Sequence, residues 1–391
     1  DRFVIHWEIK SEDGVVKTGK IANPNINPDE SKTFSLNFDG VNFKEEKEYF
    51  LNFKAYLDNS WGLLNKGELL ASEQIQIEDA IKELFASNEN KPKVKETKTI
   101  ITVTGNNFEL IFDKASGEIS SWQVNNKDFI TDSPMPNFWR APTDNDYGYN
   151  MNDRLKVWRN AAQDAKPATN AVVKQNNDNV EVVTSFNLAN NAGEVTISYE
   201  IYGSGDVILN YDYKPSNENL PVMPRIGMMF TLPSKFENVK WYGRGPWENY
   251  IDRKSSTFVD VYESSVEDLF ENYPMPQENG YRTDTRWLTI TTKSGDGWLV
   301  EADDNLFGFS ALHFTPEDLT KEGRGLWYPH DLNPREEVVL HIDHKMMGVG
   351  AEQSWGARPY DIYSVQPHSY NYKIRLKPFV KDEKIQTGKQ F

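Results

Sequence analysis

The residues VTISYEIYGSGDVILNYDY, numbered 195–213, show most directly how this 391-residue chain folds. A large apolar side chain occupies every second position in both halves: Val195, Ile197, Tyr199, Ile201, Val207, Leu209, Tyr211 and Tyr213. A period of two is typical of a β-strand that buries one face. Because the glycine-rich segment 203–206 separates the halves, the stretch predicts a β-hairpin.

Strand patterns dominate the rest of the chain as well. Phe34, Leu36 and Phe38 alternate with polar residues, and segments 176–179 and 294–297 have turn composition. A helical period is confined to two segments of about two turns each, Glu78–Phe85 and Arg154–Ala161. We therefore predict an all-β chain.

The length suits two or three domains. Residues 86–98 are polar and charged and almost lack large apolar side chains, so we place a boundary there. The predicted organisation is a small β-sandwich at 1–85, a linker at 86–99, a large β-domain at 100–380 and a polar tail at 381–391.

Composition narrows the classes of partner. The formal net charge of −16 argues against nucleic acid and anionic membranes, and no stretch approaches the roughly 20 apolar residues of a membrane helix. Eleven tryptophans and eighteen tyrosines offer faces for the apolar C–H surfaces of neutral sugars. The lack of cysteine excludes disulfides, thiolate metal sites and a cysteine nucleophile, but it leaves the compartment open.

The stretch FWRAPTDNDYG, residues 138–148, is the first candidate functional loop. It combines aromatics, an arginine, two carboxylates and an amide with Pro142 and Gly148, which disfavour a regular helix or strand. Its residues 144–148 (DNDYG) resemble the start of a calcium-binding EF-hand loop. The glutamate required at the twelfth position is Leu155 here, which rules out that motif.

Two carboxylate pairs, Asp144 with Asp146 and Asp303 with Asp304, are candidates for glycosidase acids. That chemistry needs two carboxylates that converge from either side of the scissile bond. Close neighbours in sequence seldom do so, and such pairs more often order a loop or face solvent. We therefore expect no catalytic carboxylate among them.

His341 and His344 have a spacing that suits a metal site on a helix, but their surroundings predict a strand. A strand directs residues three apart to opposite faces. We expect one to pack in the sheet and the other to lie at the surface.

Trp355 follows a glycine-spaced segment, residues 347–350, and sits in a predicted loop. Such a tryptophan either plugs the domain's own core or offers an exposed platform for a ligand. Because large aromatic side chains are mostly buried, the residues alone favour the plug.

Several stretches, taken in order, resemble the C-terminal portion of the β-galactosidases of glycoside hydrolase family 2. They are 138–148, 241–253 (WYGRGPWENYIDR), 273–280 (YPMPQENG), 309–313 (FSALH) and 341–355. Ordered motifs at family-like spacing are far more specific than any one of them. Residues 1 to about 85 resemble the later strands of the family's preceding immunoglobulin-like domain, and a missing part of that sheet would expose an edge prone to self-association.

The resemblance implies an all-β fold: a partial immunoglobulin-like sandwich followed by a large galactose-mutarotase-like β-supersandwich. In the family, the catalytic glutamates lie on an upstream (β/α)₈ barrel, and this last domain closes one side of the sugar pocket. We therefore expect no catalytic residue here and no activity from this chain alone. The whole enzyme would be a retaining β-galactosidase.

The resemblance also implies site residues. Trp355 matches a tryptophan that stacks on the sugar, which reverses the preference for a plug. The expected pocket wall comprises Arg140, Asp144, Asn145, Asp146 and Gly148. The run Ala351-Glu352-Gln353 departs from a more glycine- and aspartate-rich run in well-known members, which leaves the sugar preference open.

Partners and cofactors follow from the same resemblance. We expect β-galactosides such as lactose and the barrel domain as partners, within a homo-oligomer of the full-length enzyme. No cofactor is expected in this chain, whereas the upstream domains would hold Mg²⁺ or Na⁺. Cytoplasmic and periplasmic locations both stay open.

Two other functions remain as alternatives. One is an independent carbohydrate-binding module, which the aromatic content favours. The other is a sugar isomerase of mutarotase type, which rests on fold analogy alone. That chemistry needs a histidine and a carboxylate that converge on the sugar ring, and the sequence identifies no such pair.

Overall fold

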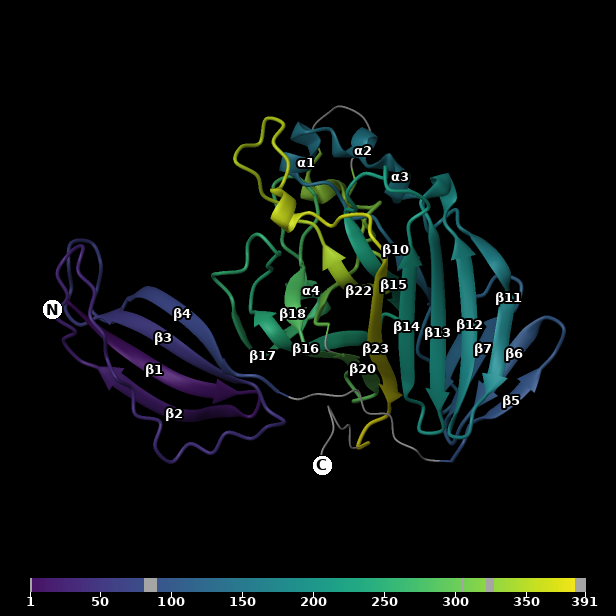
Figure 1. Ribbon diagram of the computed structural model, residues 1–391, viewed down its shortest axis with the longest axis horizontal. Helices are drawn as coiled ribbons and strands as arrows, with labels where there is room; N and C mark the ends of the chain where they lie inside the picture. The colour runs from purple at the N-terminus through teal and green to yellow at the C-terminus, as the bar shows by residue number, and fades with distance from the viewer. Residues whose placement is uncertain (1, 81–89, 304, 321–326, 384–391) are drawn as a thin grey trace. The chain divides into compact units, whose positions relative to one another are not determined.

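The computed structural model describes residues 2–80, 90–303, 305–320 and 327–383, and it is all-β apart from a few short helices (Figure 1). The chain divides into two compact units, the first mainly β1–β4 and the second mainly β5–β23. Within the described ranges, no helix is long and apolar enough to cross a membrane. The prediction of an all-β chain is confirmed.

The first unit is one antiparallel sheet with strand order β2-β1-β3-β4. Its strands are β1 (Phe3–Ser11), β2 (Gly14–Ile21), β3 (Tyr49–Leu57) and β4 (Leu69–Glu78). The strand predicted around Phe34–Phe38 is wrong, because residues 30–38 belong to no strand. Leu36 and Phe38 instead pack on the core beside Trp7. The alternating pattern therefore arises because one side of this segment covers the core, although its backbone pairs with no strand.

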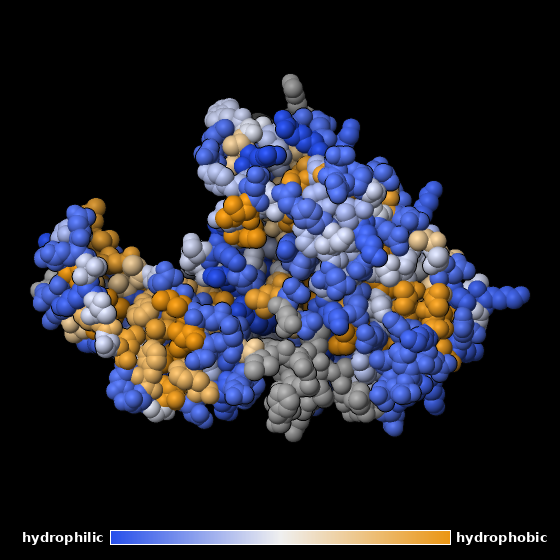
Figure 2. Space-filling view, viewed as in Figure 1, coloured by the Kyte–Doolittle hydropathy of each residue, from blue (hydrophilic) through white to orange (hydrophobic). Residues whose placement is uncertain are grey.

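Apolar side chains are exposed on the outermost strands of this sheet. Among the described residues β2 and β4 are the edges, and they expose Val15, Val16, Leu69, Leu70 and Ile75. Figure 2 shows apolar surface over this unit. Because an exposed edge is a template for pairing with another strand, self-association of this unit stays a prediction.

The second unit is built from three sheets. The largest has nine strands in the order β11-β12-β13-β14-β23-β20-β19-β16-β17. Their bounds are β11 (Lys166–Gln175), β12 (Asn179–Asn187), β13 (Glu194–Tyr202), β14 (Val207–Lys214), β16 (Phe236–Gly245), β17 (Phe258–Ser265), β19 (Trp287–Thr292), β20 (Gly297–Ala302) and β23 (Tyr370–Phe379).

Two five-stranded sheets accompany it. One has the order β10-β15-β22-β21-β18 and comprises β10 (Asp132–Asn137), β15 (Arg225–Leu232), β18 (Arg282–Thr285), β21 (Phe307–Leu312) and β22 (Val338–Met346). The other runs from β5 to β9 and comprises β5 (Lys93–Glu96), β6 (Ile100–Thr104), β7 (Phe108–Asp113), β8 (Ile119–Val124) and β9 (Lys127–Asp128). Because β5 pairs with β6, residues 93–96 belong to a sheet rather than to the predicted linker at 86–99.

The hairpin predicted at 195–213 forms as β13 and β14, with Val195 opposite Tyr213 and Ile201 opposite Val207. The turns at 176–179 and 294–297 also join consecutive antiparallel strands. In these three places turn composition between alternating runs was sufficient to locate a hairpin.

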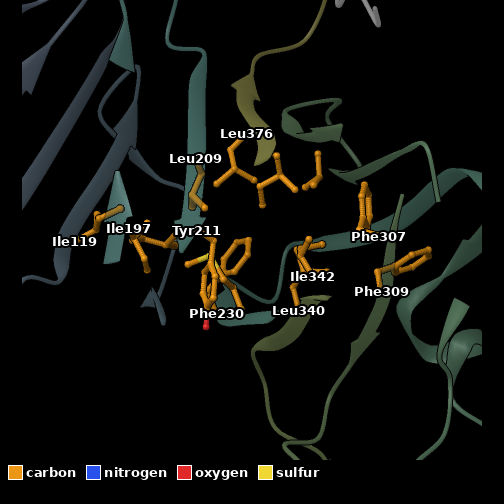
Figure 3. Packing of buried hydrophobic residues seen from close by; sticks show 14 of the residues in the cluster. Ile119, Ile197, Leu209, Tyr211, Phe230, Phe307, Phe309, Leu340, Ile342 and Leu376 are labelled. Atoms are coloured by element: carbon orange, nitrogen blue, oxygen red, sulfur yellow. The ribbon is translucent and has the colours of Figure 1, made fainter. Parts of the chain in front are cut away.

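The core of this unit lies between the nine-stranded sheet and the two smaller sheets. Figure 3 shows Leu209 and Tyr211 of β14 beside Phe230 of β15, with Leu340 and Ile342 of β22 nearby. All five side chains are essentially inaccessible to solvent. Burying one such side chain contributes about 1.5–3 kcal/mol, so the sheets are held together chiefly by this contact.

The helices are short. They are α1 (Asp144–Gly148), α2 (Met151–Arg154), α3 (Lys156–Arg159) and α4 (Val266–Leu269), with single 3₁₀ turns η1 (Ala189–Asn191), η2 (Pro329–Asp331) and η3 (Asp361–Tyr363). The helix predicted at Arg154–Ala161 contains α3. The other prediction fails at Glu78, which ends β4, and its residues 81–85 lie outside the described residues.

The two histidines of β22 follow the strand geometry. His341 is buried, and His344 is half-buried with its ring stacked on Tyr372 at a centroid distance of 5.0 Å. Burial lowers the pKa of His344 to about 4. The expectation that one of the pair lies at the surface therefore holds only in part, because Tyr372 of the neighbouring sheet covers one face of the half-buried His344 ring.

Inside the fold, the Arg225 side chain meets three other ionisable side chains, those of Asp343, Glu278 and His341. Its Nε lies 2.9 Å from Asp343 Oδ2, and its Nη2 donates to Glu278 Oε1 at 3.2 Å. Its Nη1 lies 2.9 Å from His341 Nδ1, which must accept because a guanidinium only donates. Burial and the adjacent Arg225 charge lower the pKa of His341, so its ring is neutral.

The Asp343 carboxyl titrates near neutral pH. Burial raises its pKa from 3.8 to about 7, against the opposing charge of Arg225 and with the help of Glu278. A raised carboxyl pKa means that the folded state holds the proton more tightly than the unfolded state does. The associated stability is present below pH 3.8 and is lost as the pH rises to about 7.

We predict that Asp343→Asn gains stability relative to the native chain as the pH rises from 4 to 8, because asparagine does not titrate. The shift should be at least about 1 kcal/mol, measured by urea unfolding at several pH values. Asp361→Asn is the control, since the Asp361 side chain is 83% exposed. Parallel stability curves for Asp343→Asn and the native chain would contradict the assignment.

Candidate functional site

The start of the 138–148 stretch is anchored in the core. The Phe138 ring lies 5.6 Å from the Trp158 ring and 5.4 Å from the Tyr213 ring, measured between centroids. Trp139 is buried as well. Because β10 ends at Asn137, these aromatics fix the point at which the polar part of the loop begins.

A reciprocal cap turns the polar part into the short helix α1. The backbone N–H and Oγ1 of Thr143 donate to Asp146 Oδ2 at 2.8 and 3.0 Å, and the Asp146 N–H donates back to Thr143 Oγ1 at 3.4 Å. This capping box satisfies N–H groups of the first turn. Pro142 and Gly148 were expected to disfavour a regular helix, but five residues between Thr143 and Tyr149 form one because of this cap.

Arg140 and Asp146 form a buried ion pair, with side chains 0% and 1% exposed. Both terminal nitrogens of Arg140 donate to the Asp146 carboxylate, Nη2 to Oδ1 at 3.2 Å. Burial alone would lower the pKa of Arg140, but Asp146 raises it overall, so the guanidinium stays charged. Both side chains are too deeply buried to contact a ligand directly, so they act on the loop's shape.

The same loop is tied to the segment that precedes Trp355. Arg140 Nη2 donates to the carbonyl of Gly348 at 3.2 Å, and Asn145 Nδ2 donates to the carbonyl of Val349 at 3.0 Å. The two segments are about 200 residues apart in sequence. These side-chain-to-backbone hydrogen bonds hold the two loops against each other.

Gly148 extends this contact to the tip of the second loop. A Cβ built on Gly148 would lie 2.3 Å from the carbonyl oxygen of Ser354 and 3.3 Å from the nitrogen of Gly356. Only a glycine permits so close an approach of two backbones. Gly148 therefore places Trp355 directly beside the Asp144 loop.

Asp252 holds the second loop from another side. Its Oδ1 accepts from the Val349 N–H at 3.2 Å, and its Oδ2 accepts from the Gly350 N–H at 2.7 Å. A Cβ on Gly348 would lie 2.4 Å from the same carboxylate. The glycine spacing of residues 348–350 thus admits the Asp252 side chain to the backbone.

The Gln277 side chain fixes the position of Asp144 through two hydrogen bonds. The Asp144 N–H donates to Gln277 Oε1 at 3.2 Å, and Gln277 Nε2 donates to Asp144 Oδ2 at 3.3 Å. Asp144 remains exposed. Its carboxylate therefore has a fixed position and can still meet a ligand.

Trp355 is 92% exposed. Its loop also exposes Tyr360 and Ile362, and the Tyr360 hydroxyl donates to Glu352 Oε1 at 2.6 Å. The interpretation as a core plug is therefore wrong. A large aromatic face is available at the tip of a loop whose base is held by the contacts of Arg140, Asn145 and Asp252.

The site combines recognition groups but offers no pair of catalytic acids. Asp144 is exposed while Asp146 is committed to Arg140, so the two do not converge on one point. Asp303 is half-buried, and Asp304 lies outside the described residues. Over the ranges that the structure covers, no three histidine, aspartate or glutamate side chains gather as a metal site.

Sequence reasoning missed Asp252 and Gln277, the two outside supports of the loops. Both lie in stretches that carry the family resemblance, 241–253 and 273–280, and that membership was the available signal. The fold brings these stretches to the loops at 138–148 and 348–356. Of the predicted site residues, Asp144, Gly148 and Trp355 are exposed, Asn145 is half-buried, and Arg140 and Asp146 are buried.

We predict that Gly148→Ala forces the two loops apart, because backbone atoms of Ser354 cannot avoid the new Cβ by rotation. The expected cost is about 1–3 kcal/mol of stability, with faster amide hydrogen exchange in residues 354–356. Gly350→Ala is the matched control and should cost less, since the nearest atom to its Cβ is a side-chain oxygen at 3.2 Å. Unchanged exchange at 354–356 would contradict this packing.

Comparison with known proteins identifies relatives along the whole chain. The family model described as beta galactosidase small chain matches residues 104–376, and that of beta-galactosidase domain 4 matches residues 1–78. The β-galactosidase of Priestia megaterium is 32% identical, over 90% of this chain and 34% of that protein. The β-galactosidase of Pseudoalteromonas haloplanktis is 30% identical, over 96% of this chain and 36% of that protein. The chain thus spans about a third of these curated relatives.

Solved structures with a similar fold include a galactose mutarotase related enzyme from Lactobacillus acidophilus, with a TM-score of 0.40 and 10% identity over 73% of this chain and 99% of that one. A putative aldose 1-epimerase from Escherichia coli K12 has a TM-score of 0.37 and 10% identity over 71% of this chain and 98% of that one. The small-chain family model covers well over half of the residues. This chain therefore belongs to the β-galactosidase small-chain family.

Proposed function

We propose that this chain completes the sugar pocket of a retaining β-galactosidase and presents Trp355 as a stacking platform. The observation that carries the proposal is a tryptophan 92% exposed at the tip of a loop that is braced from several sides. Tryptophan is enriched at interfaces because its large apolar ring adds contact area while its N–H can still hydrogen-bond. Membership in the β-galactosidase small-chain family makes a galactoside the ligand of first choice.

The division of labour follows from the chemistry. Retaining hydrolysis uses two carboxyl groups roughly 5 to 5.5 Å apart, one as nucleophile and one as acid and then base. In this proposal an upstream (β/α)₈ barrel supplies both. This chain supplies the apolar face of Trp355 for sugar C–H groups and the Asp144 carboxylate as an acceptor for a sugar hydroxyl.

The buried contacts would serve this role by fixing the platform before substrate arrives. A loop that must be ordered on binding spends part of the interaction energy on that ordering. Arg140, Asp146, Asn145 and Asp252 remove this cost, because they hold both loops through charged or backbone hydrogen bonds. Any Mg²⁺ or Na⁺ of the enzyme, and its homo-oligomeric contacts, would belong to the full-length protein.

An independent carbohydrate-binding module is the second candidate. It is favoured by the same exposure of Trp355, which is present without any upstream domain. The two functions differ in what they require: a module binds sugar alone, whereas a pocket wall acts only with the barrel.

The deciding experiment is hydrolysis of an aryl β-galactoside by the purified chain, alone and mixed with the upstream portion of the enzyme. We expect no turnover from either part alone and turnover on mixing. Turnover by this chain alone would overturn the proposal, because it would require catalytic carboxylates in this sequence. No turnover on mixing, with both parts shown to associate, would overturn it as well.

In the reconstituted enzyme we predict that Trp355→Ala raises KM about tenfold, with a smaller effect on kcat, because stacking contributes to binding of substrate and transition state alike. Trp355→Phe should retain part of the effect. Trp247→Ala, which removes another exposed tryptophan, is the control and should leave KM unchanged. Equal KM values for Trp355→Ala and the native chain would remove the platform from the mechanism.

A further inference from the structure

A cavity of about 1030 Å³ lies in the larger unit, away from the loops at 138–148 and 348–356. We name it the Phe270 pocket. It is lined by α4 and the residues after it, by the start of β16, by the two residues that follow β21 and by segment 329–334. Strands β21 and β22 are antiparallel, with Leu312 opposite Val339, so the pocket is at the N-terminal end of β22. The Trp355 loop leaves the other end, roughly 30 Å away for a nine-residue strand.

The floor of the Phe270 pocket is apolar. The rings of Phe270 and Phe314 lie 5.0 Å apart between centroids at an interplanar angle of 41°. Phe314 is almost buried and Phe270 is half-buried, so the Phe270 ring keeps an accessible part. Leu332 and Pro334 extend the same surface. Such a floor suits the C–H face of a ligand.

His313 and Glu237 form a histidine–carboxylate pair in the wall of the Phe270 pocket. His313 Nδ1 lies 3.0 Å from the carbonyl oxygen of Glu337, and Nε2 lies 3.1 Å from Glu237 Oε1. Both ring nitrogens therefore face oxygen acceptors. The His313 backbone is held too, because its carbonyl accepts from the Arg335 N–H at 2.8 Å. The pair is preorganised, and the second Glu237 oxygen can accept a further hydrogen bond.

The remaining polar lining mixes donors with acceptors. Asn238 and Asn272 offer both in one side chain, Lys293 adds a donor and Glu267 adds an acceptor. Carboxylates and cationic side chains occur together, so the lining does not select strongly for a charged ligand. Hydroxyl groups, which donate and accept at once, match this mixture best.

We infer that the Phe270 pocket is a second saccharide-binding site, and that its ligand is a neutral oligosaccharide. The aromatic floor meets C–H faces, the amides and carboxylates meet hydroxyls, and the volume lies just above the usual range for ligand pockets, roughly 300–1,000 Å³. The site needs neither the barrel nor Trp355, so it stands independently of the proposed function.

The test is binding of lactose, cellobiose and maltose to this chain, measured by titration calorimetry and by saturation-transfer NMR at millimolar sugar concentrations. Phe270→Ala removes the aromatic floor of the pocket, and Glu237→Ala removes a hydrogen-bond acceptor from its wall. Because Glu237 is partly exposed, Glu237→Ala tests the site even if Phe270→Ala does not fold. Thermal unfolding checks both. Trp61→Ala, which removes an exposed tryptophan of the first unit, is the control, and Trp355→Ala tests whether the sugar binds at the loops instead.

We expect a disaccharide to bind the native chain and Trp61→Ala equally, and to bind Phe270→Ala or Glu237→Ala about tenfold more weakly. Binding lost in Trp355→Ala and kept in both pocket variants would overturn the inference and assign the sugar to the loops. An absence of binding to the folded native chain would overturn it too. Neither result bears on reconstituted hydrolysis, so the two proposals fail separately.

Discussion

The buried ion pair between Arg140 and Asp146 is the interaction on which the candidate site depends. Removing two charges from water costs several kcal/mol per ion, so such a pair is a poor source of stability unless its remaining hydrogen bonds are satisfied. Here Nη1 and Nη2 of Arg140 also donate to the carbonyls of Ala141 and Gly348, and the surplus acceptors of Asp146 cap α1, whereas Nε of Arg140 has no hydrogen-bond partner in the part of the chain that the structure describes. The pair therefore specifies a geometry that joins two distant segments.

A second buried charge cluster, around Arg225, includes two side chains of β22, the strand from which the Trp355 loop departs. Gly348 follows β22, which carries His341 and Asp343, and Glu278 is adjacent to Gln277. Arg225 and Arg140 also repel each other through the interior, and the Glu278 carboxylate between the two clusters interacts favourably with both. The loops thus rest on a polar interior, whereas the rest of the unit is held by apolar contact between sheets.

Sequence reasoning succeeded where a local pattern fixes the outcome. The alternation at 195–213 and the turns at 176–179 and 294–297 define hairpins without reference to the rest of the chain. It failed where tertiary contact decides. Residues 34–38 alternate because they cover a core, α1 forms because Asp146 returns to Thr143, and His344 is sheltered by Tyr372 on another sheet. Asp252 and Gln277 could not be chosen from single-sequence patterns, since their partners lie about 100 residues or more away.

The depth of the Arg140–Asp146 pair has a consequence for how salt acts on the site. Mobile ions screen exposed charges over a distance of about 8 Å at physiological ionic strength, but they act far less on a pair closed off from water. The side chains of Arg140 and Asp146 are 0% and 1% exposed. The shape of the Trp355 loop should therefore be the same in dilute buffer and in concentrated salt, even though the chain as a whole carries a net charge of −16 and its surface responds strongly to both.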